Sequence, residues 1–300
     1  MKILITGGLG FVGRQLTTEF LTRGDRVTIV DLPSQQTVFT QDTLTYISAD
    51  TTVPGEWQKS VVEADIVINL AGVTIFKRWT TAFKEKIYNS RILTTRNIAE
   101  VLPKGKDMTF ISTSAVGYYG WRGSEKLTEG DTPGNDFLSH VCQDWEQEAL
   151  RGRKNGVRVV ITRFGIVLGK SGGVLGTMIP LFKLFAGGRL GKGSQWFTWV
   201  HGKDLVAGIL YILDTPSIKG PVNLCAPNPV TNRTLTRTLG KIMHRPSLLP
   251  VPSFALKLVL GEFADNILRG QRVIPEKIQK AGFEFKYREI ESALREILQK

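Results

Sequence analysis

Three glycines near the start of the chain could bring phosphate groups against the backbone. Gly7, Gly10 and Gly13 are spaced three residues apart. They lie between a β-rich run at Lys2–Thr6 and a helical pattern over Phe11–Arg23. Glycines at such a junction permit a tight turn and a close approach of the backbone to a pyrophosphate, and the N–H groups of the following helix attract anions. The loop therefore predicts a dinucleotide site rather than a merely structural turn.

A carboxylate after the second predicted strand could select between dinucleotides. Asp31 ends the β-rich run that begins at Arg26, 18 residues after Gly13. A carboxylate at this place accepts hydrogen bonds from the adenosine ribose hydroxyls and repels the 2′-phosphate of NADP. The next residues, Leu32-Pro33-Ser34, include no Arg that could hold that phosphate. We therefore expect NAD or NADP as the cofactor, with NAD favoured by Asp31, although an ordinary acidic strand end is the alternative.

The remaining pattern alternates short apolar runs with longer helical segments, which indicates a parallel sheet covered by helices. Further strands are predicted at Leu44–Ser48, Ile66–Leu70, Thr109–Thr113 and Val157–Arg163, and helices at Thr80–Val101 and at about Phe137–Arg151. The fold class is therefore α/β, a Rossmann doubly wound parallel sheet with helices on both faces and a smaller C-terminal substrate lobe.

The composition of the sequence changes after Gly165, where many glycines flank one apolar segment at Leu175–Phe185. We expect residues 1–165 to form the NAD(P)-binding Rossmann domain and residues 166–300 to form the smaller substrate-binding lobe, from which the chain can cross back to the main sheet. Later elements are predicted as a strand at Val222–Leu224, a helix capped by Thr231, and helices at Phe254–Leu260 and Arg288–Leu298.

The positive charge lies almost wholly in the second half of the chain. The formal net charge is +12, and Lys plus Arg against Asp plus Glu number 20 against 18 up to Val167 and 19 against 9 after it. No dense basic run or nucleic-acid motif accompanies this excess, so we expect no nucleic-acid partner. An anionic small substrate with an apolar part, or simply a solvated basic face, explains the charge better.

The composition also limits the compartment and the metal chemistry. No apolar run reaches the ~18 residues that a membrane span needs, and no signal peptide is recognisable, so we expect no membrane partner. Cys142 and Cys225 are far apart and have no metal-ligand spacing. They indicate buried residues in a reducing compartment, which predicts a cytoplasmic protein without a metal site. A homodimer remains open.

The motifs taken together resemble the extended short-chain dehydrogenase/reductase family. The matching segments are TGGLGFVG at Thr6–Gly13, NLAG at Asn69–Gly72, STS at Ser112–Ser114, RFGIVLG at Arg163–Gly169 and WVHGKDL at Trp199–Leu205. Ser90-Arg91-Ile92 and Gly270-Gln271-Arg272-Val273 are similar to an atypical subgroup, the NAD-dependent epimerase/dehydratase-like "epimerase family" proteins. The resemblance implies an NAD(P)-dependent oxidoreductase, epimerase or dehydratase.

The resemblance also implies which residues contact the cofactor. Asp50 follows the third predicted strand, where the family contacts adenine, although a surface carboxylate is equally open. Arg91 lies on the helix after NLAG, where the subgroup reaches the cofactor. The full set of expected cofactor residues is Gly7, Gly10, Phe11, Val12, Gly13, Asp31, Leu32, Asp50, Leu70, Ala71, Gly72, Arg91 and Val167.

The family's catalytic pair is missing from this sequence. Its chemistry rests on a Tyr four residues before a Lys, but none of the six tyrosines is followed by a Lys at that spacing. Alignment puts Leu138 and Cys142 at those two positions. A proton donor must then come from elsewhere, and Ser112, Ser114 and Tyr119 are the expected catalytic residues. Tyr119 is the preferred acid, against the alternative that it only packs in the pocket wall.

The substrate motif departs from the family as well. Nucleotide-sugar epimerases carry an Arg four residues before the His that is His201 here, and this sequence has Phe197 at that place. His201 and Asp204 are expected to dock the second lobe. Two hypotheses remain: an enzyme acting on an unknown small molecule through a non-standard acid, and a catalytically silent NAD(P)-binding sensor or regulator.

Overall fold

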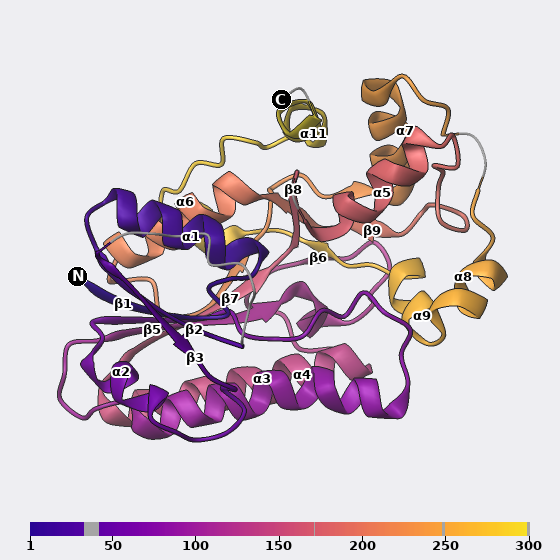
Figure 1. Ribbon diagram of the computed structural model, residues 1–300. Helices are drawn as coiled ribbons and strands as arrows, with labels where there is room; N and C mark the ends of the chain where they lie inside the picture. The colour runs from indigo at the N-terminus through magenta and orange to yellow at the C-terminus, as the bar shows by residue number, and fades with distance from the viewer. Residues whose placement is uncertain (33–41, 171, 248–249, 299–300) are drawn as a thin grey trace.

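The centre of the molecule is a seven-stranded sheet (Figure 1). The computed structural model describes residues 1–32, 42–170, 172–247 and 250–298, so Pro33 and Ser34 lie outside the described residues. The strand order is β11-β7-β5-β4-β1-β2-β3, and every neighbouring pair is parallel. The strands are β1 (Lys2–Thr6), β2 (Arg26–Asp31), β3 (Leu44–Ser48), β4 (Ile66–Asn69), β5 (Thr109–Ala115), β7 (Arg158–Phe164) and β11 (Gly220–Leu224).

Helices cover both faces of this sheet, which confirms the predicted Rossmann architecture. Side chains alternate across each strand, so Ile3 and Ile5 of β1 pack on one face and Leu4 packs on the other. The first face carries α1 (Phe11–Thr22) and α6 (Gly202–Asp214), and the second carries α2 (Trp57–Glu63), α3 (Thr81–Val101) and α4 (Phe137–Leu150). Figure 1 shows α1 and α6 above the sheet and α3 and α4 below it.

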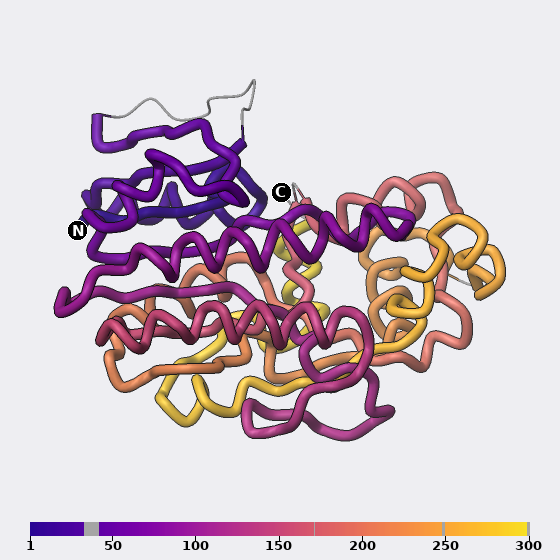
Figure 2. Tube along the Cα trace, turned by 90° about the horizontal axis from the view of Figure 1, so that it is seen from below, coloured from indigo at the N-terminus to yellow at the C-terminus, as the bar shows by residue number. Residues whose placement is uncertain are grey.

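Capping side chains define where α3 and α4 begin. Thr80 accepts a hydrogen bond from the backbone of Phe83 at 3.2 Å, and Asp136 accepts one from Ser139 at 2.9 Å. Such caps satisfy N–H groups that have no partner within the helix. The two helices run side by side under the sheet (Figure 2), and the Tyr88 hydroxyl donates to Asp144 between them at 2.8 Å.

Part of the second half of the chain packs around an apolar core of its own and is called the lobe below. The helices of the second half besides α6 are α5 (Gly173–Lys183), α7 (Asn232–Met243), α8 (Ser253–Leu260), α9 (Phe263–Leu268), α10 (Glu276–Lys280) and α11 (Ile290–Leu298). Of these, α5, α7 and α11 pack around the core of the lobe, whereas Ile278 of α10 packs on the α1 face of the main sheet. Three short strand pairs join the lobe: β8 (Ile166–Gly169) with β10 (Trp199–His201), β9 (Trp196–Phe197) with β12 (Val230–Thr231), and β6 (Lys126–Leu127) with β13 (Arg272–Val273). Trp199, Leu235 and Leu294 are fully buried in this core.

The second half is also tied to the first through the main sheet. β11 comes from beyond residue 166, yet it pairs with β7 in parallel from Gly220 to Leu224. Two short 3-10 helices lie beside these strands in the sequence: η1 (Val116–Tyr119) follows β5, and η2 (Arg151–Asn155) precedes β7. The lobe therefore lies at the carboxyl ends of the strands β5, β7 and β11.

Candidate functional site

The glycine loop lies at the point where the strand order reverses, between β1 and β4. Gly7 has a φ of +71°, and a Cβ on it would lie 2.9 Å from the backbone nitrogen of Ala71. The loop after β1 therefore packs directly on the loop after β4. In open parallel sheets, ligands bind at this reversal, outside the carboxyl ends of the strands.

The N-terminus of α1 is open toward this point. Gly10 is the N-cap and provides no side-chain hydrogen bond to the helix amides. A Cβ on Gly13 would lie only 2.4 Å from the carbonyl oxygen of Gly7, so the helix and the loop approach each other as closely as glycine allows. These backbone N–H groups and the dipole of a 12-residue helix together form a fitting cradle for a pyrophosphate.

Phe11 and Val167 connect the cradle to the second lobe. Phe11 is half-buried, and Cβ atoms built on Gly169 or Gly172 would lie 2.6 Å from its ring. Val167 lies on β8 and pairs in register with Val200 of β10. Val12 is half-buried and packs against the core on the α1 face. The predicted residues Phe11 and Val167 therefore lie where the two halves of the chain meet.

Asp31 lies at the carboxyl end of β2 and is hydrogen-bonded to the glycine loop. Its two oxygens accept from the backbone of Leu9 at 3.0 Å and of Leu32 at 2.8 Å. Leu32 is 54% exposed. Asp50, by contrast, is exposed and accepts from the backbone of Thr52 at 2.9 Å within its own turn. Asp31 thus belongs to the loop cluster, whereas the structure gives Asp50 a local turn contact.

The NLAG segment is ordered by a buried amide. Asn69 accepts a hydrogen bond from the Thr6 hydroxyl at 2.7 Å and donates to the Thr95 hydroxyl at 2.8 Å. It thereby joins β4 to β1 and to α3. The following residues Leu70 and Ala71 are half-buried and Gly72 is exposed, so this loop presents its backbone at the sheet edge.

Arg91 of α3 lies over the end of the NLAG segment. Its guanidinium donates to the carbonyl oxygens of Ile87 at 3.0 Å and Val73 at 3.1 Å, and it lies 5.3 Å from the centre of the Trp145 ring. A Cβ on Gly72 would be 3.2 Å from its central carbon. Burial lowers the pKa of Arg91 to about 10, which still leaves it charged at neutral pH.

The two predicted serines lie on one face of β5, and both are buried. Ser114 donates to Glu146 of α4 at 2.7 Å, whereas the hydroxyl of Ser112 has no hydrogen-bond partner. Near Ser114, burial raises the pKa of the Cys142 thiol to about 11, so this thiol is protonated at neutral pH. The unpartnered Ser112 oxygen is therefore the free hydroxyl of this pair.

The hydroxyl of Tyr119, the expected acid, has a hydrogen-bond partner on both sides in the structure. The side chain is 0% exposed. Its hydroxyl donates to Asn223 at 2.7 Å and accepts from Arg163 at 2.9 Å. Burial raises the pKa of Tyr119 above its ordinary value despite the nearby guanidinium. The alternative that Tyr119 packs in the wall fits the structure, since both sides of its hydroxyl are engaged.

An ion pair that the sequence reasoning missed holds this region together. Arg163 donates two hydrogen bonds to Glu146, at 2.8 and 2.7 Å, and the side chains are 2% and 7% exposed. Burial alone would lower the pKa of Arg163, but the carboxylate of Glu146 outweighs it and raises the pKa. The only signals in the sequence were a Glu four residues after Cys142 and an Arg ending an apolar strand.

His201 and Asp204 fasten the C-terminal segment, as expected. Asp204 accepts from the backbone of Lys286 at 3.0 Å and of Tyr287 at 2.8 Å. His201 lies 2.9 Å from Glu296 of α11 and stacks on Tyr287. Burial lowers the pKa of His201. These two residues connect α6 to α11.

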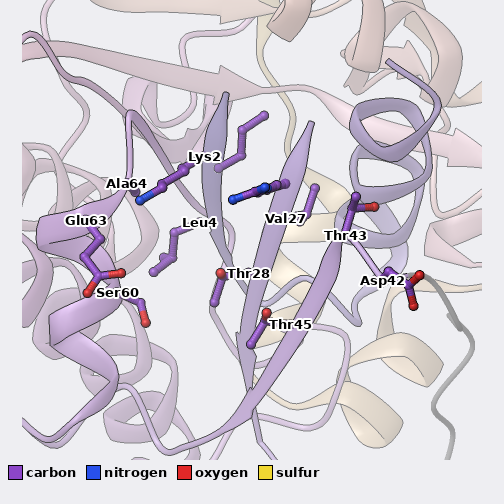
Figure 3. Close-up of a pocket in the computed structure, with 12 residues that line it drawn as sticks. Lys2, Leu4, Val27, Thr28, Asp42, Thr43, Thr45, Ser60, Glu63 and Ala64 are labelled. Carbon is purple, nitrogen blue, oxygen red and sulfur yellow. The ribbon is translucent and has the colours of Figure 1, made fainter. Parts of the chain in front are cut away.

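A separate hollow of about 480 Å³ lies at the opposite edge of the sheet (Figure 3). Lys2, Arg26 and Thr43, which line it, stand at or just before the starts of β1, β2 and β3. Because ligands of such sheets bind at the carboxyl ends of the strands, this hollow is distinct from the candidate site. In the described part of the chain, no helix could cross a membrane, and no cluster of His, Cys, Asp or Glu could hold a metal ion.

Comparison with known proteins places the chain among described families. The model of the NAD dependent epimerase/dehydratase family matches residues 3–225, and a domain of unknown function, DUF1731, matches residues 251–297. The chain is 40% identical to the epimerase family protein SDR39U1 homolog, chloroplastic, of Arabidopsis thaliana, covering 100% of this chain and 87% of that protein. It is 39% identical to the epimerase family protein YfhF of Bacillus subtilis, covering 99% and 98%.

A solved structure agrees over the whole length. The crystal structure of the human epimerase family protein SDR39U1 with NADPH superposes with a TM-score of 0.86 at 29% identity, covering 100% of both chains. The family model spans the glycine loop, the NLAG segment and the serine-bearing strand β5. This chain therefore belongs to the NAD dependent epimerase/dehydratase family.

Proposed function

We propose that the chain binds NAD or NADP on its glycine loop and acts as an NAD(P)-dependent oxidoreductase, epimerase or dehydratase on a small molecule. The observation that carries the proposal is the Gly13 contact, in which a Cβ would lie 2.4 Å from the Gly7 carbonyl, beside a helix N-terminus without a side-chain cap. The human relative was crystallised with NADPH, which supports the same class of cofactor.

The proposed cofactor residues divide into those near the phosphates and those near the two ends of the dinucleotide. Gly7, Gly10, Phe11, Val12 and Gly13 would hold the pyrophosphate. Asp31, Leu32 and Asp50 would lie toward the adenosine, and Leu70, Ala71, Gly72, Arg91 and Val167 toward the nicotinamide. When bound, the cofactor supplies a hydride acceptor or donor. NAD is favoured over NADP because the Asp31 carboxylate would face a 2′-phosphate, and Leu32, which follows it, supplies no cation.

Of the expected catalytic residues Ser112, Ser114 and Tyr119, we propose that the two serines contact the substrate. Ser112 has a buried hydroxyl without a partner, which is the condition expected of a group that awaits a ligand or a water molecule. Ser114 donates its hydroxyl hydrogen to Glu146, so toward a substrate its oxygen can act only as a hydrogen-bond acceptor. The substrate we propose is anionic with an apolar part, held between residues 1–165 and the lobe formed from residues 166–300.

A second candidate is a sensor that binds the cofactor without chemistry. It is favoured by the complete engagement of the Tyr119 hydroxyl and by Leu138 and Cys142 at the usual acid positions. Incubating the chain with NAD or NADH and a panel of hydroxy acids, keto acids, aldehydes and nucleotide sugars distinguishes the two. A change in reduced-nicotinamide absorbance or an epimerised product supports the enzyme. Tight cofactor binding without turnover across the panel supports the sensor.

A further inference from the structure

Arg91 is a charged group whose surroundings do not neutralise it. In the part of the chain that the structure describes, its guanidinium bonds only to the carbonyl oxygens of Ile87 and Val73, and no carboxylate pairs with it. The other arginine of α3 behaves differently, because Arg96 pairs with Glu148 at 2.8 Å. A half-buried cation without a carboxylate leaves its positive potential to act on whatever lies next to it.

The position of Arg91 relative to the reversal of strand order indicates which half of a bound dinucleotide would lie beside it. A dinucleotide lies across the reversal with one nucleotide on each side. Asp31, which ends β2, marks the adenosine side, so the nicotinamide half falls on the side of β4 and β5. Arg91 is on this second side, because a Cβ on Gly72 after β4 would lie 3.2 Å from its central carbon.

The charge of Arg91 then discriminates between the two redox forms of the cofactor. The oxidised nicotinamide ring carries a positive charge and the reduced ring is neutral, so a nearby guanidinium disfavours the oxidised form. We infer that Arg91 is a specificity-determining residue that shifts the binding preference of this chain toward the reduced dinucleotide. This inference rests on the proposed dinucleotide site. The Trp145 ring, 5.3 Å from the guanidinium centre, and the two carbonyl oxygens hold it in that position.

The test is the ratio of dissociation constants for NAD+ and NADH, measured by calorimetric titration of the full chain. Arg91→Met should lower this ratio by about fivefold or more, because a lost repulsion favours the oxidised form alone. Arg91→Lys should keep the wild-type ratio, since it keeps the charge. Arg96→Met is the matched control, because it removes a cation from the same helix while Glu148 retains Arg151, and its ratio should equal that of the wild type.

Three results would overturn the inference. Equal weakening of NAD+ and NADH in Arg91→Met would make Arg91 a phosphate ligand without redox selectivity. Unchanged dissociation constants for both forms in a folded Arg91→Met chain would remove Arg91 from the cofactor site. Failure of the wild-type chain to bind either dinucleotide would overturn the proposed function together with the inference, and this outcome is separable because it precedes any variant.

Discussion

Asp31 accepts a hydrogen bond from the backbone N–H of Leu9 at 3.0 Å, so the carboxylate at the end of β2 is joined to the glycine loop. This bond fixes one carboxylate oxygen beside the site proposed for the phosphates. The second oxygen accepts from the backbone of Leu32, whose own side chain is apolar and exposed. In the described residues Asp31 forms no salt bridge, while the Arg14 guanidinium donates to the carbonyl oxygen of Leu9 on the same loop at 2.7 Å.

The first prediction follows from this charge. Replacing Asp31 with Ser and Leu32 with Arg should shift preference from NADH toward NADPH by about tenfold or more, because a lost repulsion and a gained pairing each amount to about 1–2 kcal/mol. Calorimetric titration of the wild type and the double variant with both dinucleotides measures the shift. Tighter binding of NADPH than NADH by the wild type would contradict the role given to Asp31.

The second prediction concerns Tyr119. Tyr119→Phe should lower the free energy of unfolding by about 1–3 kcal/mol, because it leaves an Arg163 donor and the Asn223 acceptor without their partner. Urea denaturation measures the change. Tyr46→Phe is the control, since the Tyr46 hydroxyl makes an exposed bond to the Leu32 carbonyl. A variant with unchanged stability but abolished turnover would restore Tyr119 as the acid.

The third prediction concerns the buried ion pair. Glu146→Gln should destabilise the chain by about 3–5 kcal/mol, because it leaves the Arg163 charge buried without a countercharge. The matched control is Glu291→Gln, which removes the carboxylate of the exposed pair with Arg295 and should leave the unfolding midpoint nearly unchanged. Equal urea midpoints for the two variants would show that the buried pair adds nothing beyond a surface pair.

The main sheet and its glycine loop were predictable because their signals are local. β1 and β3 have the expected bounds, and Thr231 accepts from the backbone of Thr234 at 3.2 Å as the expected helix cap. The alternation that marks a short strand and the glycine spacing that marks the loop both involve residues that are close together in the sequence. The same holds for Asp31, whose position depends only on the length of the first β-α-β unit.

The helix α6 was not predicted, although Gly202–Asp214 is strongly amphipathic. Its N-cap is His201, whose ring accepts from the backbone of Lys203 at 3.0 Å, in place of the usual Ser, Thr, Asp or Asn. The start signal was therefore absent. The segment also follows directly on the short strand β10, and its first helical residue is a glycine.

The catalytic region could not be predicted because its contacts are long-range. Tyr119 and Asn223 are 104 residues apart, and Arg163 reaches both Tyr119 and Glu146 from another strand. In the sequence, Tyr119 stands close to Arg122 and Lys126. In the structure the partner of Tyr119 is Arg163 of β7, because the pairing of β5 with β7 places Arg163 next to Ser114 and close to the segment that follows β5. These side-chain contacts depend on which strands are neighbours in the sheet, and the order of the strands cannot be read from individual residues.

The central claim is that the glycine loop holds a nicotinamide dinucleotide, and calorimetric titration with NADH tests it most directly. The wild-type chain and Gly176→Val, whose glycine has no neighbouring atom within 4 Å of a Cβ, should bind with equal affinity. Gly13→Val should show no binding while circular dichroism reports a folded chain, because its Cβ would collide with the Gly7 carbonyl. Equal affinity in all three chains, or no binding by the wild type, would contradict the account.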